Sequence, residues 1–461
     1  MRTIINNKGY GIYLNSIIKE ELETLKEILT VKPIVLADYD FGQIEPFSIY
    51  RLSDTRIYIP KYYGIKKYGL PSQIKEKEGQ DIDFIFKGQL KDHQVDFCNV
   101  ILKEIKENGS CIGCSSTGSG KTAMALWTVS QIKKRTLIVV HKEFLMNQWI
   151  ERIQQFLPDA SIGIIQQNKC ETDKDIIIGM VQTITSREFP PETFDNIGYF
   201  VADEVHHLAA KSFSQVLYKC KTKYTLGLSA TPKRVDGLTK VLEWFCGPII
   251  KNEIVSEVES PDIKIIEAEY STNIVPKFNF KGNLNAPNMI NQLVIDPIRN
   301  KKIINEIIAL NKEGRKILVL SGRREHCVQL NEMIGVYNLS TGLYMGGMSN
   351  ENLEKSNKTN IIFATYQSVS EGYDNPALDT LIMATGMGNV QQSIGRILRR
   401  KNKFKPLVVD IIDPEFFGGQ ARRRKQYYKK NKYIILGEKI KPKVVKDLED
   451  SEDSEEECMF K

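Results

Sequence analysis

The sequence predicts an α/β protein in which two parallel-sheet domains stand in tandem after a small α+β unit. The main observation is that short apolar, β-rich segments alternate with helical stretches from residue 86 onward. Such alternation indicates parallel sheets, because helices join their strands and cover both of their faces. The predicted strands form two blocks, 136–140, 175–181, 198–203 and 224–230, then 316–320, 360–365, 378–384 and 406–413.

Shifts in composition divide the chain into five parts. Residues 1–85 hold one helical pattern and short segments rich in Tyr, Ile and Pro, which predict a small α+β domain. Residues 86–260 and 299–435 are the two alternating blocks. Residues 261–298 break the rhythm with Pro and Asn, as expected for a connector. Residues 436–461 end in an acidic run, which predicts a disordered tail.

Charge is spread unevenly along the 461 residues. The net charge is +7, but the last fourteen residues hold seven acids and one lysine, so the remainder carries +13. A basic body suggests a polyanionic partner, although many basic proteins bind nothing anionic.

The hydropathy pattern argues against a membrane partner. No apolar run approaches the roughly 20 residues that a membrane helix needs. The N-terminus also lacks the apolar block of a signal peptide. We therefore expect a soluble, intracellular protein with reduced cysteines. Cys111 and Cys114 are three residues apart in a predicted strand, so their side chains face opposite ways and indicate free thiols rather than zinc ligands.

A glycine-rich segment, SSTGSGKT at 115–122, follows a predicted strand and opens a helix. In this setting backbone N–H groups wrap a polyphosphate, and the helix N-terminus adds partial positive charge. Lys121 would contact the β- and γ-phosphates, and Thr122 would hold Mg²⁺ through its hydroxyl. The usual first glycine of this pattern is replaced by Ser115, which affects mainly the turn. The residues expected to bind ATP here are Ser115, Ser116, Thr117, Gly118, Ser119, Gly120, Lys121 and Thr122.

Two adjacent acids end another predicted strand, in VADEVHH at 201–207. Asp203 is placed to hold Mg²⁺, directly or through water, and Glu204 can orient and deprotonate an attacking water. Surface charge is the alternative interpretation, which an upstream phosphate loop makes weak.

A cluster of arginines lies in QQSIGRILRR at 391–400, where Arg396, Arg399 and Arg400 fall within about one helical turn. On its own this cluster could be a solvated helix face.

Taken in order, STGSGKT, DEVH, SATP (229–232) and QSIGRILR (392–399) resemble the motifs of superfamily 2 helicases and translocases over about residues 86–435. The resemblance implies two RecA-like domains with ATP and Mg²⁺ between them. The DEVH motif and the last motif, which begins with Gln, resemble the DNA-directed branch more than the DEAD-box RNA branch. Residues 228–249 and 391–401 resemble helicases related to XPB, phage branch-remodelling helicases and large-DNA-virus helicases, including the poxvirus transcript-release type.

Roles for individual residues follow from this resemblance. Arg396 and Arg399 resemble arginine fingers, which stabilise charge on the transferred phosphoryl group, and the other catalytic residues would be Lys121, Asp203 and Glu204. Further nucleotide contacts are implied for Gln94, which would read the adenine, and for Gly372, Asp374 and Gln392.

The resemblance also implies contacts with a nucleic-acid backbone. The segments concerned are 139–149, 179–184, 319–326 and 364–379, in which Thr365 would contact a phosphate. Residues 421–433 mix basic and aromatic side chains, which suit either phosphate contacts with base stacking or a basic helix docked by its tyrosines.

The expected function is an ATP-dependent helicase or translocase that acts on DNA with 3′-to-5′ movement, in transcription, repair or recombination. Transcription or replication machinery would be a partner, and a viral member would work in the host cytoplasm or the virion. The alternatives are an RNA helicase, a nucleic-acid-binding module with a decayed ATPase, and the motor half of a restriction-type nuclease. The complete set of catalytic residues disfavours the decayed module, and the lack of a visible nuclease metal cluster disfavours the last.

Overall fold

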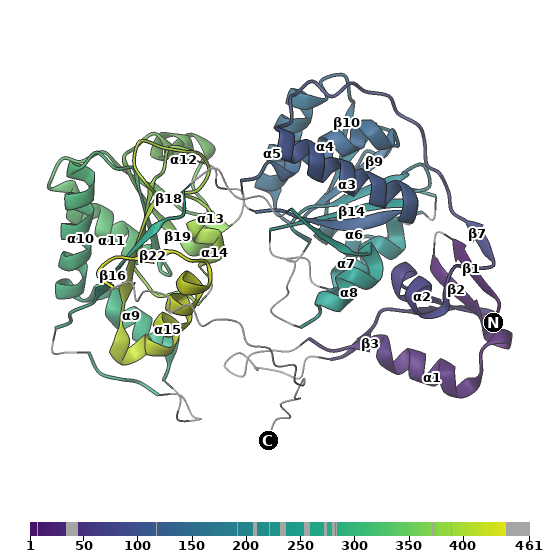
Figure 1. The fold of residues 1–461 in the computed structure, drawn as a ribbon, viewed down its shortest axis with the longest axis horizontal. Coiled ribbons are helices and arrows are strands. Elements are labelled where there is room, and N and C mark those ends of the chain that lie inside the picture. The colour runs from purple at the N-terminus through teal and green to yellow at the C-terminus, as the bar shows by residue number, and fades with distance from the viewer. Residues whose placement is uncertain are drawn as a thin grey trace, which may run out of the picture.

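The computed structural model describes residues 1–6, 8–33, 45–116, 118–190, 192–205, 210–220, 222–230, 237–252, 259–271, 274–278, 282, 284–370, 373, 375–388 and 390–438. Figure 1 shows three units along the chain: a small N-terminal unit in purple, a first α/β domain in blue to teal, and a second in green to yellow. Among the described helices, none is both long and apolar enough to span a membrane.

The N-terminal unit is a five-stranded sheet with helices on one face. Its strand order is β5-β6-β2-β1-β7, and only the β1–β7 pair is parallel. Alternate strand residues such as Tyr10, Ile12 and Ile57 form a core with α1 and α2. The elements are β1 (Thr3–Asn6), β2 (Gly9–Tyr13), a 3₁₀ turn (Leu14–Ser16), α1 (Lys19–Ile28), β3 (Thr30–Val31), β4 (Phe47–Ser48), β5 (Arg51–Leu52), β6 (Arg56–Ile59), α2 (Lys61–Tyr68) and β7 (Gln73–Lys75).

The first α/β domain has the strand order β11-β10-β12-β9-β13-β14-β8-β15, with every pair parallel except β10–β11. Helices α3 to α5 pack on one face, and α6 to α8 pack on the other. The strands are β8 (Ser110–Cys114), β9 (Thr136–Val140), β10 (Ile162–Gln166), β11 (Lys169–Cys170), β12 (Ile176–Met180), β13 (Tyr199–Ala202), β14 (Tyr224–Ser229) and β15 (Ile249–Lys251). The helices are α3 (Asp92–Asn108), α4 (Lys121–Ile132), α5 (Glu143–Phe156), α6 (Val181–Ser186), α7 (Ala210–Cys220) and α8 (Thr239–Cys246).

The second α/β domain is an all-parallel sheet of order β18-β19-β17-β20-β21-β16-β22. Helices α10 and α11 cover one face, and α13 to α15 cover the other. The strands are β16 (Asp262–Glu267), β17 (Ile317–Ser321), β18 (Thr341–Tyr344), β19 (Ile361–Thr365), β20 (Thr380–Met383), β21 (Leu407–Ile412) and β22 (Ile434–Ile435). The helices are α9 (Ala286–Ile295), α10 (Pro297–Lys312), α11 (Arg324–Gly335), α12 (Asn350–Asn357), α13 (Tyr366–Ser370), α14 (Gln391–Ile394) and α15 (Pro414–Lys430).

These two sheets confirm the predicted fold class, since each of the eight predicted strands coincides with a strand of a parallel sheet. Among the described residues, Cys111 and Cys114 are both unbridged.

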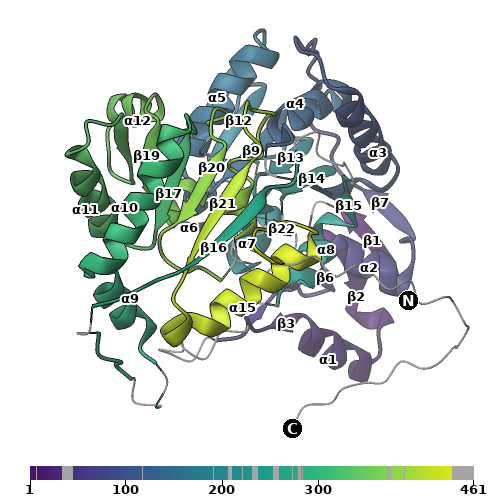
Figure 2. The ribbon, with the colours of Figure 1, turned by 60° about the vertical axis from the view of Figure 1, so that its left-hand side comes forward.

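The expected connector at 261–298 needs correction. Strand β16 pairs with β21 from Asp262 opposite Leu407 to Glu267 opposite Ile412, so it belongs to the second sheet, as Figure 2 shows. Helix α9 also lies within the supposed connector, and the side chain of Asn285 caps it by accepting from the backbone of Asn288. Charged residues interrupt the apolar residues of β16, because it lies near the sheet edge, and this hid the strand from the apolar pattern.

The boundary expected at residue 85 also shifts. After β7 the chain runs back along the first α/β domain, where Gln80 N–H donates to Asn196 and the Phe86 ring stacks on Phe156 at 5.2 Å. A Cβ on Gly79 would lie 2.3 Å from the backbone nitrogen of Gly198, so only glycine allows this approach. The segment between β7 and residue 86 therefore packs as part of the first α/β domain.

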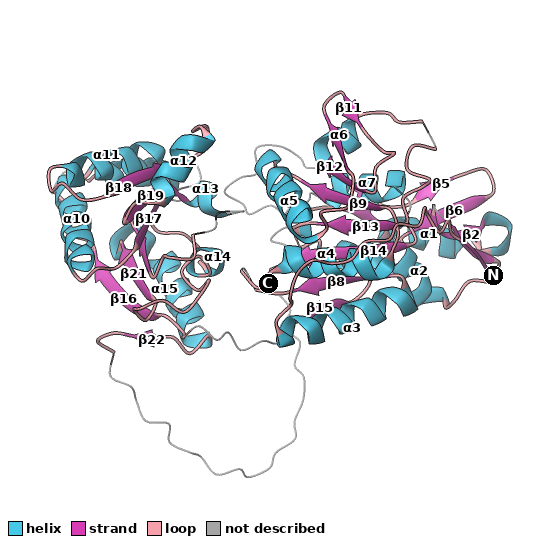
Figure 3. Ribbon diagram, turned by 90° about the horizontal axis from the view of Figure 1, so that it is seen from above, coloured by secondary structure: helices cyan, strands magenta, loops and turns pink. Residues whose placement is uncertain are grey.

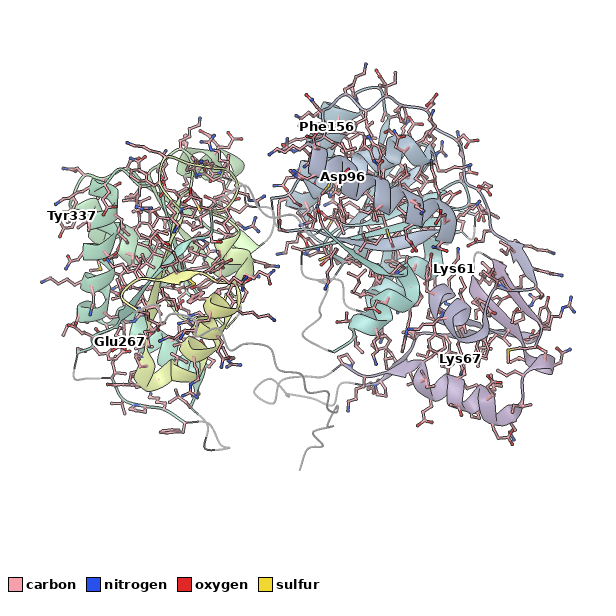
Figure 4. All side chains as sticks on the ribbon, in the orientation of Figure 1. Lys61, Lys67, Asp96, Phe156, Glu267 and Tyr337 are labelled. Carbon is pink, nitrogen blue, oxygen red and sulfur yellow. The ribbon has the colours of Figure 1, made fainter. Side chains whose placement is uncertain are left out.

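The N-terminal unit is docked on the first α/β domain. Val241 of α8 lies in the core of the N-terminal unit, and Trp244 of α8 meets Tyr63 edge to face at 5.1 Å. The buried hydroxyl of Tyr218 on α7 donates to the Ile49 carbonyl at 2.7 Å. In Figure 4, Lys61 of α2 lies where the two units meet.

A buried ion pair joins α10 to the end of β21. Arg299 donates to both carboxylate oxygens of Asp413, at 2.8 and 3.0 Å, and to the Ala384 carbonyl at 2.7 Å. Replacing Asp413 with Ala leaves a buried guanidinium without its counter-ion, so we expect a loss of about 3–5 kcal/mol in the unfolding free energy. Urea denaturation followed by circular dichroism measures this loss.

The matched control is Lys355→Ala, which removes an exposed i,i+4 pair with Glu351. It should cost no more than about 0.5 kcal/mol. Equal effects of the two substitutions would contradict a structural role for the Arg299–Asp413 pair.

Candidate active site

The glycine-rich loop lies between β8 and the N-terminus of α4, as the sequence predicts. Gly118 and Gly120 have φ values of 83° and 84°, a left-handed conformation that favours glycine. Ser115 is buried, its backbone N–H donates to Ser229 at 3.0 Å, and its hydroxyl accepts from Asn252 at 3.2 Å. A serine therefore fits where the pattern usually has glycine. Ser116 is exposed and Thr117 lies outside the described residues.

The side chain of Lys121 lies inside this loop. Its amine donates to the Ser115 carbonyl at 3.3 Å and stands 3.7 Å from a Glu204 carboxylate oxygen. A phosphate entering the loop can take over the first contact, since an ammonium group is a mobile point charge. Thr122 follows on the first turn of α4, and both residues line the pocket beside the loop.

Asp203 lies directly after β13 and accepts two hydrogen bonds. Its carboxylate accepts from the indole N–H of Trp149 at 2.8 Å and from the Glu204 backbone N–H at 2.9 Å. Burial, and next the Glu204 carboxylate, raise the pKa of Asp203 to about 6, whereas Trp149 and Lys121 favour its charged form. A cation would relieve this destabilised charge, so the site suits a metal ion.

Glu204 adopts an unusual backbone conformation with φ 44°. Non-glycine residues in this left-handed region are strained and cluster at functional sites. The conformation places the Glu204 carboxylate beside Lys121, in the pocket that the loop borders.

Gln94 of α3 supports the loop from behind. Its amide oxygen accepts from the Lys91 N–H at 2.9 Å, and its amide nitrogen donates to the Ser119 carbonyl at 2.7 Å. Gln94 thus fixes the position of the loop through Ser119. Its contact with adenine stays a prediction.

Arg396 and Arg399 reach the loop from the second domain. Both guanidinium groups donate to the Tyr373 carbonyl, at 2.6 and 3.2 Å. Arg399 lies against the loop so closely that a Cβ on Gly118 would be 2.6 Å from its Cδ. Figure 3 shows α14, which precedes these arginines, on the side of the second domain that faces α4 and α5.

Side chains of both domains line one open pocket, whose volume is about 540 Å³. This lies within the roughly 300–1,000 Å³ of typical small-molecule sites, so a nucleoside triphosphate fits. Its lining combines cations, which suit the negative charge of a triphosphate, with acids, which suit binding of a metal ion and of a water molecule. The lining residues are Gly118, Gly120, Lys121, Thr122, Ala123, Leu145, Gln148, Glu151, Arg152, Phe156, Asp203, Glu204, Arg396 and Arg399.

The site fits a Mg²⁺ ion whose coordination the substrate phosphates would complete. Mg²⁺ prefers oxygen ligands and commonly takes only one or two from the protein. Thr122 and Asp203 supply a hydroxyl and a carboxylate at the same pocket. In the described part of the chain, no group of three or more His, Cys, Asp or Glu side chains could hold a metal by itself.

Other predicted nucleotide contacts are less central. Gln392 is partly buried on α14, outside the set of side chains that line the pocket. Gly372 and Asp374 lie outside the described residues. Arg400 is exposed and donates to Asn402, consistent with a solvated charge.

Sequence reasoning missed the structural roles of Trp149 and Asn252. Trp149 was placed in a segment assigned to nucleic-acid contact, yet it is buried and its indole holds Asp203. A tryptophan on the apolar face of a predicted helix needs a partner for its N–H. This need was the signal in the sequence that could have indicated a structural role for Trp149.

The segments predicted to contact nucleic acid lie at the carboxyl ends of neighbouring strands. In the first domain these strands are β9 and β12, and Gln182 after β12 donates to the His141 carbonyl after β9 at 2.8 Å. In the second domain they are β17 and β19, which also pair directly. Because parallel strands end at one sheet edge, each domain presents its two segments together.

The basic, aromatic segment 421–433 is a docked helix and turn. Tyr428 is buried and donates to Asp410, to which Arg424 also donates at 2.9 Å. Tyr427 and Tyr433 pack beside it. This arrangement favours the docked-helix interpretation over base stacking.

Comparison with known proteins agrees with this geometry. Residues 87–234 match the family described as type III restriction enzyme, res subunit. A protein of Acanthamoeba polyphaga mimivirus, provisionally named as an ATP-dependent RNA helicase, is 34% identical over 96% of this chain and 89% of its own length. A protein of invertebrate iridescent virus 6, provisionally named as a helicase, is 26% identical over 93% of this chain and 99% of its own.

Among solved structures, T4 UvsW is 18% identical and covers 95% of this chain and 99% of its own, with a TM-score of 0.37. Dbp5 of S. cerevisiae bound to RNA is 12% identical, covers 74% of this chain and 91% of its own, and has a TM-score of 0.49. The mimivirus relative confirms the predicted resemblance. The chain belongs to the superfamily 2 helicases and is an ATP-dependent helicase enzyme.

Proposed function

We propose that this helicase is a DNA translocase that moves 3′ to 5′ and serves transcription, repair or recombination. The observation that carries a motor function is the pocket that Lys121, Asp203 and Glu204 of one domain share with Arg396 and Arg399 of the other. A site split in this way links nucleotide state to the spacing of the two domains.

In the first domain, the loop amides and Lys121 bind the β- and γ-phosphates of ATP. Thr122 and Asp203 would hold Mg²⁺, which would neutralise negative charge on the phosphates. Glu204 orients water and accepts its proton as the water oxygen bonds to the γ-phosphorus and the β–γ bridging bond breaks. The strained backbone of Glu204 fixes this carboxylate next to Lys121.

In the second domain, Arg396 and Arg399 stabilise the negative charge on the γ-phosphoryl oxygens. Arg396 is held apart from solvent, being 3% exposed, so its charge acts in a poorly screened environment, whereas Arg399 is partly buried. Release of phosphate removes this bridge and lets the domains separate. The strand-end segments of each domain then grip nucleic acid in alternation, which moves the protein along one strand.

DNA is the substrate that the sequence motifs favour, and the matched family is described as a restriction-enzyme subunit. RNA is the second candidate, because the mimivirus and African swine fever virus relatives are provisionally named as RNA helicases. Direct contact with transcription or replication machinery belongs to the same proposal.

Stimulation of ATP hydrolysis separates the two substrates. With Mg²⁺, we expect single-stranded or forked DNA to raise the steady-state rate at least tenfold, and RNA to raise it less, because nucleic acid favours the closed state of the pocket. A phosphate-release assay measures the rates.

Glu204→Gln is the control for contaminating ATPases and should bind ATP without turnover. Stimulation by RNA alone would replace the DNA proposal with an RNA helicase. Nicking of plasmid DNA by the pure protein with Mg²⁺ would revive the nuclease alternative.

The arginines of the second domain should act on hydrolysis more than on binding. We expect Arg396→Ala and Arg399→Ala each to lower kcat on the order of a thousandfold, because charge on the transferred phosphoryl group loses its partner. The affinity for ATP, measured with a fluorescent analogue, should change only a few-fold.

Arg400→Ala is the matched control, since Arg400 is a neighbouring but exposed arginine. Arg396→Lys tests whether the planar guanidinium is needed, independently of charge. Unchanged kcat in the Arg396 and Arg399 variants would refute their assignment.

Trp149 should be a positioning residue for the metal site. Trp149→Phe removes the hydrogen bond to Asp203 but keeps an aromatic ring in the core. We expect the Mg²⁺ concentration for half-maximal hydrolysis to rise roughly tenfold, as for other residues that hold a metal ligand. Titration of ATPase activity with Mg²⁺ measures this shift.

Trp127→Phe is its control, because Trp127 packs against the same core without touching Asp203. A purely structural role for Trp149 predicts a lower melting temperature with an unchanged Mg²⁺ requirement, which would contradict the assignment.

A further inference from the structure

The N-terminal sheet has two chemically different faces. Ile5, Tyr10 and Ile57 point to the inner face, where α1, α2 and α8 complete the core. Side chains alternate along a strand, so Ile4, Gly11 and Tyr58, which are paired in register, belong to the outer face. Figure 1 shows α2 between the sheet and the first α/β domain, and at the β1–β2 turn Lys8 lines a pocket with Tyr218 and Lys223 of that domain.

Arginines and tyrosines stack on this outer face. The guanidinium carbon of Arg2 lies 4.4 Å from the Tyr13 ring centroid, and that of Arg56 lies 4.2 Å from the same centroid. Arg56 also donates to the hydroxyls of Tyr13 and Tyr58, at 2.7 and 3.2 Å. Stacking holds each guanidinium in place. Arg2 is exposed, whereas Arg56 is partly exposed and keeps only the second N–H of each terminal nitrogen for a further acceptor.

Gly11 explains why the Tyr58 ring lies flat on the sheet. A Cβ at Gly11 would lie 3.0 Å from the Tyr58 ring and 3.1 Å from the Ile4 side chain. The ring therefore covers the gap that Gly11 leaves, and Lys8 lies over it at 5.6 Å from its centroid. The surface is a built cationic and aromatic face, not a scatter of mobile lysines.

We call the outer-face residues Arg2, Lys8, Tyr13, Arg56, Tyr58 and Lys75 the N-terminal basic face. Lys75 belongs to it because β7 pairs with β1, which sets Lys75 beside Asn6. Within the described ranges, none of its four cations forms an ion pair, whereas Lys26 and Lys61 elsewhere in the unit pair with Glu23 and Glu76.

The acids of helix α1 are segregated from the N-terminal basic face. Helix α1 carries Glu20, Glu21, Glu23 and Glu27, and its Leu25 packs into the inner core, so these acids lie across the sheet from the cations. The four cations of the face stand beside few acids, of which Glu76 follows Lys75 and is paired with Lys61, and this excess of positive charge favours a polyanion.

We propose that the N-terminal basic face binds the phosphate backbone of the nucleic acid on which the motor acts, with Arg2 and Arg56 as its principal phosphate ligands. Planar guanidinium groups match phosphate geometry through paired N–H donors, and pre-ordering by tyrosine lowers the entropy cost of each contact. This inference rests on the proposed function, since it assumes that the motor binds nucleic acid.

The face would be a fixed second anchor rather than a tethered one. Tyr218 and α8 dock the N-terminal unit on the first α/β domain, so the strand held outside the motor keeps a constant relation to that domain. Such an anchor raises the effective concentration of nucleic acid at the motor while the second domain moves.

The test measures how affinity for a fluorescein-labelled 40-nucleotide strand, of DNA and of RNA, depends on salt. Each phosphate contact on a single strand contributes about 0.7 to the slope of log affinity against log salt. Arg2→Gln with Arg56→Gln should therefore lower the slope by about 1.4, and weaken binding at low salt roughly tenfold, by loss of two contacts. ATP hydrolysis without nucleic acid should be unchanged.

Lys8→Gln with Lys75→Gln is a second variant that leaves the tyrosine hydrogen bonds intact, in case Arg56→Gln lowers the melting temperature. It should lower the slope in the same direction. Lys19→Gln with Lys66→Gln is the matched control, because it removes two exposed cations from α1 and α2. Its slope should stay near that of the wild type.

The outcomes separate the inference from the function it rests on. Wild-type binding that both face variants leave intact would overturn the inference and leave an acidic polypeptide as the occupant to test. Wild-type protein that binds neither strand would overturn the proposed function together with the inference. Equal loss in the face variants and the control would mean a general charge effect and would also overturn it.

Discussion

The contact of Arg399 with the glycine-rich loop is the interaction on which the account of this helicase depends. Each parallel sheet is complete by itself, and each has its own core on both faces. At the loop, groups proposed as catalytic from both domains meet, and Gly118 leaves room for the Arg399 side chain. In the proposed mechanism, a triphosphate in this place would be bound by one domain and have its charge stabilised by the other, so chemistry and domain spacing would change together.

Trp149 extends this coupling inside the first domain. Helix α5 begins just after β9, in the segment expected to touch nucleic acid, and carries Trp149 to the carboxylate of Asp203. A shift of α5 on binding nucleic acid would therefore move Asp203, the proposed metal ligand, without direct contact between the nucleic acid and the nucleotide. The helix is a rigid element packed on the sheet, which makes it suited to transmit a small displacement.

The strands and the loop could be predicted from sequence because their signals are local. Apolar runs mark buried parallel strands, and SSTGSGKT fixes a strand, a turn and a helix within eight residues. Strand β16 could not be predicted from apolar periodicity, because its pairing with β21 joins residues far apart in the chain. The roles of Trp149, Asn252 and the Arg2–Tyr13–Arg56 stack depend likewise on tertiary contacts that no spacing records.

Hydrogen–deuterium exchange of the full chain, with and without ADP–beryllium fluoride, Mg²⁺ and a nucleic-acid strand, tests the central claim most directly. If the triphosphate site is completed across the two domains, peptides covering 115–122 and 391–400 should both gain protection. Protection of 115–122 alone, at saturating analogue, would contradict a shared site and would leave the arginines of the second domain without a role in hydrolysis.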